Sequence, residues 1–296
     1  FVAQRAGMDN LGPFVFTGVR FSLGAALLWP LVWVRRHKPP PDFLWAAGRR
    51  WRVYCGALLA GLVMFVGINL QQMGLVYTTA GKAGFITGLY VVMVPLLGLM
   101  WGRQTNLGCW LGIAMGTIGL YLLSVTEQFT LARGDGLVLA CAVVWAAHVW
   151  MVGWLSPKID ACFLACGQAV VCAILSLITA VILGESFSVI SIQAALIPIL
   201  WGGGMSVALG FTLQIIGQQH SPPAHAAIIM ALESVFAALA GWLILGEAMT
   251  NRGMFGAGLM LAGTLVAQMW ISPGLKRKIE GKRQKTAAGL QVDSKL

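Results

Sequence analysis

Long apolar runs, separated by short polar segments, dominate the chain. Nine of these runs are long enough to cross a bilayer as helices, because the hydrocarbon core needs about 20 apolar residues. They lie at residues 14–34, 53–75, 83–101, 107–125, 136–155, 161–183, 192–216, 224–245 and 253–272. Residues 1–8 have the character of the last turns of a tenth helix, of which this sequence holds only the end. The pattern predicts an all-α integral membrane protein with ten transmembrane helices, the first of them truncated.

The composition supports a membrane protein and excludes two other classes. Apolar side chains make up 58% of the chain and charged ones only 10%, whereas a soluble domain carries about a quarter charged residues. The same apolar content excludes disorder. The 12 Trp and 37 Gly suit helices packed in lipid, where aromatic rings sit at the interfaces and glycine lets backbones approach.

The distribution of positive charge is typical of a membrane protein rather than of a nucleic-acid-binding protein. Although the formal net charge is +10, six of the 20 Lys and Arg lie at residues 35–52 and seven at 276–295, beside apolar runs. The excess of positive charge on one side predicts cytoplasmic N- and C-termini in a plasma membrane of the bacterial inner-membrane type. Residues 273–296 are expected to form a basic cytoplasmic tail attracted to anionic lipid. The expected partners are the lipid bilayer and a small-molecule solute, with no nucleic acid.

The chain contains an internal repeat. After a shift of 143 residues, 11 of 38 positions in 61–98 match 204–241, where composition alone would give about three. The match resumes at a shift of 144 with Gly102/Gly246, Gly112/Gly256 and Gly119/Gly263. Because the matched helices are five crossings apart, an odd number, the two copies should run in opposite directions through the bilayer. Residues 1–129 and 130–272 are thus expected to form two inverted five-helix repeats, which favours a secondary transporter that works by alternating access.

Two segments resemble a known family. They are Asn-Leu-Gly-Pro-Phe at 10–14, which leads into Gly-Val-Arg-Phe at 18–21, and ALESVFAALAGWLILGE at 231–247. Both are similar to the EamA-like branch of the drug/metabolite transporter superfamily. The resemblance implies ten helices in a five-plus-five inverted arrangement and the export of amino acids or other small metabolites. The family commonly has proline after the glutamate of the second motif, but here Ser234 follows Glu233, so a proline kink cannot be assumed.

The repeat pairs polar positions in the spans. Lys82 corresponds to His225 and Tyr90 to Glu233, and in each copy the two members are eight residues apart on one expected helix. At 3.6 residues per turn they share one broad face, so both pairs are candidates for lining a central pathway. Lys82 would lie near its external mouth and His225 near its cytoplasmic mouth.

Each of these residues also has a structural interpretation. Lys82 could snorkel to the interface, and His225 could cap a helix after residues 221–223. Glu233 could bond to loosened backbone in a neighbouring helix instead of carrying a proton.

Amide and aromatic side chains complete the candidate pathway. Gln71 and Gln214 are equivalent in the repeat, and amides either bind a solute or hold helices together. Trp145 and His148 belong to one helical stripe, which is either an aromatic wall for the substrate or ordinary packing. The candidate substrate-pathway residues are Gln4, Asn69, Gln71, Gln72, Lys82, Tyr90, Trp145, His148, Phe211, Gln214, Gln218, His225 and Glu233.

Glycines and one arginine stand out inside the spans. A GxxxGxxxG ridge predicts helix packing, and three consecutive glycines weaken helix propensity, which favours a bend or hinge beside the pathway. Arg20 is expected to snorkel outward or to pair with a buried acid. The hinge and packing candidates are Gly202, Gly203, Gly204, Gly108, Gly112 and Gly116.

No motif indicates catalysis or a cofactor. The sequence has no GxxxxGK[ST], HExxH or GxSxG, and Asp9, Asp42, Asp135 and Asp160 are all expected in loops. The six cysteines form no CxxC or His–Cys cluster, so neither metal nor cofactor is expected. The sequence therefore predicts a secondary-active exporter of amino acids, aromatic ones included, or of similar small metabolites, and not an enzyme. A facilitative channel or uniporter is the alternative, and an intramembrane enzyme is less favoured.

Overall fold

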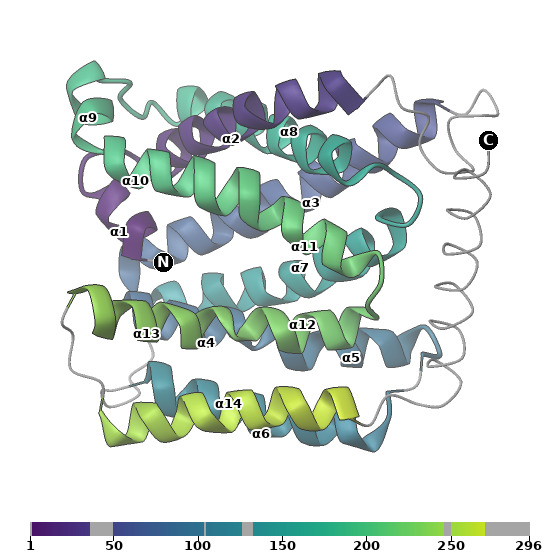
Figure 1. Cartoon of the computed structure of the whole chain (residues 1–296). Helices are drawn as coiled ribbons and strands as arrows, with labels where there is room; N and C mark the ends of the chain where they lie inside the picture. Colours follow the sequence, from purple (N-terminus) through teal and green to yellow (C-terminus); the bar gives the residue numbers. More distant parts are fainter. Residues whose placement is uncertain (1, 36–49, 104, 126–132, 246–249, 270–296) are drawn as a thin grey trace.

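The computed structural model describes residues 2–35, 50–103, 105–125, 133–245 and 250–269, all drawn in colour in Figure 1. Every regular element in these ranges is a helix. The helices are α1 (Val2–Met8), α2 (Pro13–Arg35), α3 (Arg50–Tyr77), α4 (Ala80–Gly88), α5 (Tyr90–Met100), α6 (Leu107–Ser124), α7 (Arg133–Leu155), α8 (Ala161–Ile182), α9 (Val189–Ala194), α10 (Leu196–Leu200), η1 (Trp201–Gly210), α11 (Phe211–Gln218), α12 (Pro223–Ala231), α13 (Glu233–Leu245) and α14 (Asn251–Met269).

The predicted apolar runs form these helices. Within the described ranges, seven helical segments are long and apolar enough to cross a membrane, and they coincide with the first seven predicted runs. A shorter apolar stretch, Pro223–Phe236, lies in the eighth run, and α14 lies in the ninth. The all-helical membrane class predicted from the sequence is confirmed.

Polar side chains at the helix starts supply partners for free backbone N–H groups. The side chains of Thr79, Asn106 and Asp160 accept bonds from the backbone three residues on, at 3.3, 2.7 and 3.0 Å. Helix α2 is capped from a distance instead, because the Glu185 carboxylate accepts from the N–H of Val15 at 2.8 Å. This acid ties the connection after α8 to the start of α2.

Two spans predicted to be continuous are broken. The runs 83–101 and 224–245 are divided at Leu89, between α4 and α5, and at Leu232, between α12 and α13. At each junction the leucine N–H bonds to the carbonyl three residues back, at 3.2 and 3.1 Å, which tightens the turn. The second break directly precedes Glu233, and it forms although serine, not proline, follows this glutamate. Leu89 and Leu232 are 143 residues apart, the shift of the sequence repeat.

The run 192–216 is also not one regular helix. It contains α9, α10 and α11, and its centre is the π-helix η1. The Phe211 N–H bonds to the Ser206 carbonyl five residues back, so this stretch is wound more loosely than an α-helix. Three glycines at 202–204 lie at the start of η1, where their low helix propensity favours the looser winding.

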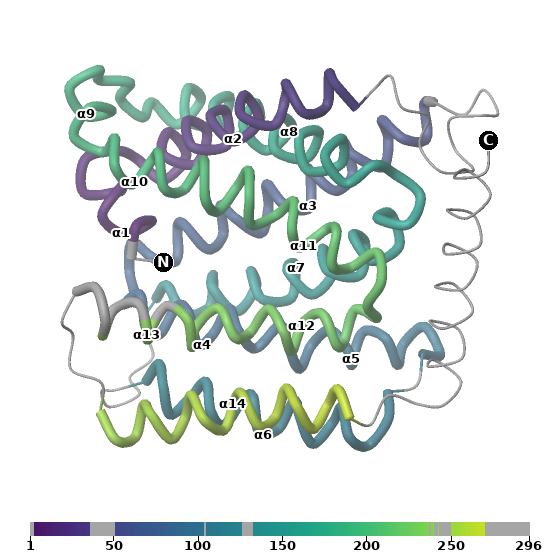
Figure 2. The backbone as a smooth tube through the Cα atoms, in the orientation of Figure 1, coloured from purple at the N-terminus to yellow at the C-terminus, as the bar shows by residue number. Residues whose placement is uncertain are grey.

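The helices pack in layers in which helices distant in sequence lie side by side (Figure 1, Figure 2). Helix α14 lies along α6, and a Cβ on Gly112 or Gly119 would stand 2.5 Å from the carbonyl oxygen of Gly263 or Gly256. Because residue numbers rise along α6 as they fall along α14, the two helices are antiparallel. Their backbones approach this closely only because glycine has no side chain.

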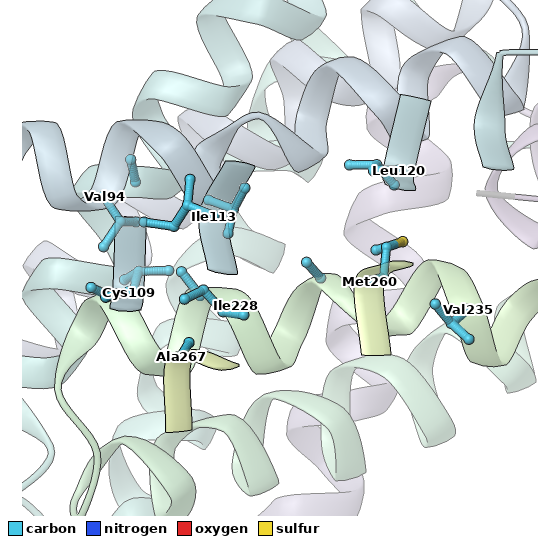
Figure 3. Packing of buried hydrophobic residues seen from close by; sticks show 14 of the residues in the cluster. Val94, Cys109, Ile113, Leu120, Ile228, Val235, Met260 and Ala267 are labelled. Atoms are coloured by element: carbon cyan, nitrogen blue, oxygen red, sulfur yellow. The ribbon is translucent and has the colours of Figure 1, made fainter. Parts of the chain in front are cut away.

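Helices α2 and α8 form a second antiparallel pair at the opposite side of the bundle (Figure 1). Gly18 packs against Leu177, and the Cys166 thiol donates to the Ala25 carbonyl at 3.7 Å. Buried side chains of α6 and α14 form a hydrophobic core with side chains of the neighbouring α5, α7 and α12, and Figure 3 shows part of this core. Val94, Ile113, Ile228 and Met260 are members of this core.

Candidate functional site

Helix α7 carries the candidate aromatic residues and contacts α3, α4, α5, α11 and α12. Trp145 stacks on Phe211 of α11 with ring centroids 5.9 Å apart, and it meets His148 edge to face at 5.2 Å. Phe21 of α2 lies 6.1 Å from Phe211. The structure thus brings three candidate pathway residues together with Phe21, and we call these four residues the aromatic cluster.

Tyr90 and Glu233 stand directly after the two helix breaks. Tyr90 is half-buried and packs against both the core of Figure 3 and the residues around Trp145. Glu233 interacts electrostatically with Tyr90, and its side chain is exposed. A helix break separates Lys82 from Tyr90, and another separates His225 from Glu233. The prediction that each pair lies on one continuous helix is therefore wrong.

A network of amides joins α1, α3 and α4. The Gln4 side-chain amide donates to the carbonyl oxygens of Gln71 and Gln72, at 3.1 and 3.2 Å. Gln71 donates in turn to the Thr87 hydroxyl at 3.2 Å, and Gln72 to the Gln4 backbone at 3.3 Å. All four residues are buried. In this region the amides hold helices together.

Lys82 forms a nearly buried ion pair with Asp135. Its ammonium group lies 2.9 Å from the carboxylate, and the two side chains are only 12% and 6% exposed. Thr78 donates to the other oxygen of Asp135 at 2.7 Å. Two expectations are therefore wrong: Asp135 lies in the first turn of α7 and not in a loop, and Lys82 does not snorkel to the surface. The run that predicts this helix begins at residue 136, one position too late to include the acid.

The equivalent region of α11 and α12 is bonded differently. Gln214 is half-buried and reaches Gln218 only at 3.5 Å, while Gln218 donates to the Val149 carbonyl at 3.0 Å. His225 is buried and caps no helix, because the cap of α12 is Pro222 and has no side-chain bond. Neither ring nitrogen of His225 has a hydrogen-bond partner of good geometry among the described residues. The proposed capping role of His225 is therefore wrong.

Two further polar pairs link α8 to the candidate residues. His148 lies 3.1 Å from the Gln168 amide oxygen, and Asn69 donates to the Ser176 hydroxyl at 3.0 Å. Gln168 and Ser176 are fully buried, and sequence reasoning missed both. The sequence signal that could have identified them is their polarity within the otherwise apolar run 161–183.

Arg20 matches neither of its two sequence interpretations. It is only 3% exposed, and among the described residues no carboxylate pairs with it. Its guanidinium carbon lies 5.3 Å from the ring centroids of both Phe16 and Phe21. Two of its three nitrogens, Nε and Nη2, have no hydrogen-bond partner within the described ranges. Cation–π contacts of this kind supply about 2 kcal/mol each at best, whereas burying an ion costs several.

Some of the glycines expected to act in hinges and packing, Gly202, Gly203 and Gly112, lie close to neighbouring helices. A Cβ on Gly202 would stand 3.2 Å from Arg20 Cδ, and one on Gly203 would stand 2.7 Å from the Arg20 backbone oxygen. Gly204 has only Leu27 near it, at 3.8 Å. In α6, Gly108 and Gly116 are buried with Gly112.

Potential metal ligands are dispersed in the part of the chain that the structure describes. No group of three His, Cys, Asp or Glu gathers there that could hold an ion. Asp42 lies outside the described residues, and Asp160 caps α8 and faces Arg35 at 3.4 Å on the surface. The polar interior is therefore built from amides, hydroxyls and isolated charges.

Comparison with known proteins agrees with this arrangement. The model of the EamA-like transporter family matches residues 1–125 and 132–269. An uncharacterized transporter of Archaeoglobus fulgidus is 28% identical over 91% of this chain and 81% of its own length. The uncharacterized transporter YoaV of Bacillus subtilis is 21% identical over 89% of both chains. A crystal structure with 18% identity has a TM-score of 0.71 over 90% of this chain and 93% of its own, which shows a shared fold. The chain belongs to the EamA-like transporter family and is an integral membrane transporter.

Proposed function

We propose that the protein is a secondary-active exporter of amino acids or similar small metabolites, and that it works by alternating access between two inverted five-helix repeats. Three features support the repeats: the family model matches two successive stretches, the helix breaks at Leu89 and Leu232 are equivalent, and α6 runs antiparallel to its counterpart α14. Inverted repeats are common in transporters whose halves rock around a midplane site. Both termini would then lie in the cytoplasm of a bacterial-type inner membrane.

The observation that carries the proposal is the position of Tyr90 and Glu233, each of which directly follows a helix break. Glu233 lies near the middle of the stretch formed by α12 and α13, and its side chain is exposed. A carboxylate facing hydrocarbon at mid-depth is costly, so such groups face the bundle interior or water. Discontinuous helices beside a midplane site are a recurring feature of transporters. We therefore assign the space beside Tyr90 and Glu233 to the solute pathway.

The neighbouring side chains favour an amphiphilic solute. The aromatic cluster offers ring faces from α7 and α11, and the half-buried Gln214 offers an amide that is only weakly bonded. The Glu233 carboxylate would attract the ammonium group of an amino acid, and the rings would receive an apolar or aromatic side chain.

The test is counterflow transport in proteoliposomes. Vesicles loaded with one unlabelled amino acid at a time are diluted into the same labelled amino acid, and transient label accumulation is measured. We expect accumulation for at least one amino acid with an apolar or aromatic side chain. Glu233→Gln should lower the initial rate at least tenfold, whereas Glu185→Gln should leave it unchanged, because Glu185 acts at the start of α2.

Other outcomes would identify another function. Label that equilibrates without overshoot would indicate a channel, and chemical conversion of the solute would indicate an enzyme. If the Glu233 and Glu185 variants transport equally well, the pathway does not pass Glu233.

A further inference from the structure

Arg20 is a permanent positive charge in the interior, and no carboxylate within the described part of the chain pairs with it. It lies seven residues into α2, which is about 10 Å along the helix axis from Pro13. Unlike lysine, arginine cannot lose its proton at any physiological pH. The four acids that flank the bundle interior have other contacts or positions: Asp135 pairs with Lys82, Asp160 with Arg35, Glu185 caps α2, and Glu233 faces Tyr90.

A second polar group lies beside Arg20 without a partner. Thr17 precedes it by three residues, so the two side chains share one face of α2. Thr17 is completely buried, and its hydroxyl, like Nε and Nη2 of Arg20, has no hydrogen-bond partner among the residues that the structure describes. Since buried polar groups are almost always satisfied, these N–H and O–H groups indicate a missing acceptor.

Small residues of the neighbouring helices surround Arg20. On one side, the π-helix η1 places Gly202 and Gly203 against Arg20, where any side chain would crowd it. On the other side, α8 presents Cys172, an electrostatic neighbour of Arg20, and Cys172 lies one turn before Ser176. Long π-helical segments are rare and often mark functional sites.

We propose that Thr17 and Arg20 form a binding site for one small monovalent anion, either a halide or the carboxylate of a small solute, where α2, α8 and η1 meet. Arg20 supplies the charge and N–H donors, Thr17 supplies a hydroxyl donor, and Phe16 and Phe21 shield the site from lipid. The site is distinct from the space beside Glu233 and does not depend on the transport assignment.

The test measures thermal unfolding of the purified full chain in detergent micelles at constant ionic strength. Sodium gluconate, whose anion is bulky, is replaced stepwise by sodium chloride or by sodium acetate. Because a ligand that binds only the folded state stabilises by mass action, the unfolding midpoint should rise by about 3 °C for each tenfold excess over the dissociation constant. Arg20→Gln should abolish the rise, and Arg20→Lys should reduce it. The matched control Arg252→Gln, at an exposed position of α14, should retain it.

Two arms separate the possible sources of the anion. A response to chloride alone indicates a halide site. A response to acetate, and to phenylalanine but not phenylalaninamide, indicates a carboxylate site. If neither chloride nor acetate shifts the wild-type midpoint, the proposal is overturned, and this result holds even if the Arg20 variants fail to fold. A shift of equal size in Arg20→Gln would overturn it as well.

Discussion

Two regions occupy equivalent positions in the sequence repeat, yet their polar side chains are bonded very differently. One lies where α3 ends and α4 begins, and the other lies where α11 ends and α12 begins. Around α3 and α4, Gln71 is held by Gln4 and Thr87, and Lys82 is paired with Asp135. Gln214 is the equivalent of Gln71, and it has one weak contact. His225 is the equivalent of Lys82, and its ring has no hydrogen-bond partner of good geometry among the described residues. The equivalent side chains are therefore firmly bonded in one region and weakly bonded in the other.

This difference teaches that the repeat preserves backbone geometry more closely than bonding. The two breaks coincide at a shift of 143, and α6 and α14 begin at positions that differ by 144. Gln4 of α1 and Asp135 in the first turn of α7, which bond to Gln71 and Lys82, both lie outside the matched segments. Substitutions in the firmly bonded region should therefore destabilise the protein more than substitutions at the equivalent positions. Three of the four predictions below test this difference, and one tests the contact between α6 and α14.

The largest effect is expected from Asp135→Asn. The substitution leaves the ammonium group of Lys82 unpaired in a nearly buried site, which costs about 3–5 kcal/mol of unfolding free energy. Thermal unfolding of the purified protein measures this loss. The matched control is Asp160→Asn, whose partner Arg35 is half exposed, and it should cost less than about 1 kcal/mol.

A double variant sharpens this prediction. Replacing both partners, as in Lys82→Met with Asp135→Leu, should recover most of the stability, because no unpaired charge remains. Equal losses for Asp135→Asn and Asp160→Asn would show that the buried pair has no special importance.

The next effect concerns the contact between α6 and α14, where the two halves match. Gly112→Ala places a Cβ 2.5 Å from the Gly263 carbonyl oxygen, so the helices must separate at a cost of about 1–3 kcal/mol. Gly116→Ala, one turn along the same ridge, meets no atom within 4 Å among the described residues. That control should be neutral or slightly stabilising, because alanine favours helix. Similar decreases in the thermal unfolding midpoint of the two variants would contradict the close antiparallel contact between α6 and α14.

A smaller difference should separate the two equivalent glutamines. Gln71→Leu leaves Gln4 and Thr87 short of buried partners and should cost about 1–3 kcal/mol. Gln214→Leu loses only a contact at 3.5 Å and should cost less than about 0.5 kcal/mol. The unfolding midpoints of the two variants test the comparison directly, and a reversed order would refute it.

The smallest effect is expected at His225. Its ring nitrogens make no hydrogen bond of good geometry among the described residues, and the ring has only a weak contact with the Ala267 backbone, so His225→Leu should change the unfolding free energy by less than about 1 kcal/mol. The same measurement on Lys82→Leu, the equivalent position, should give a loss several times larger. A large loss of unfolding free energy in His225→Leu would mean that this region is bonded as firmly as the region around α3 and α4.

Particular residues show how far sequence reasoning reached into the site. It selected Trp145, His148 and Phe211, which the structure places in one cluster, and it matched Tyr90 with Glu233, which stand at equivalent positions after the two helix breaks. It missed Asp135, because an acid at the edge of an apolar run looks like a loop residue until the opposing lysine is known. For Arg20 it offered lipid-facing and acid-paired alternatives, and both are wrong.

The sequence by itself determined the membrane class, the helices and the family, because spanning length, hydropathy and internal matches are local or linear properties of the chain. Only the tertiary structure decided which polar groups have partners. Whether an amide, an arginine or a histidine is satisfied depends on side chains from helices far apart in sequence, as Gln4 with Gln71 and Lys82 with Asp135 demonstrate. The helix breaks also needed the structure, because a single tightened turn at Leu89 or Leu232 leaves the apolar pattern unchanged.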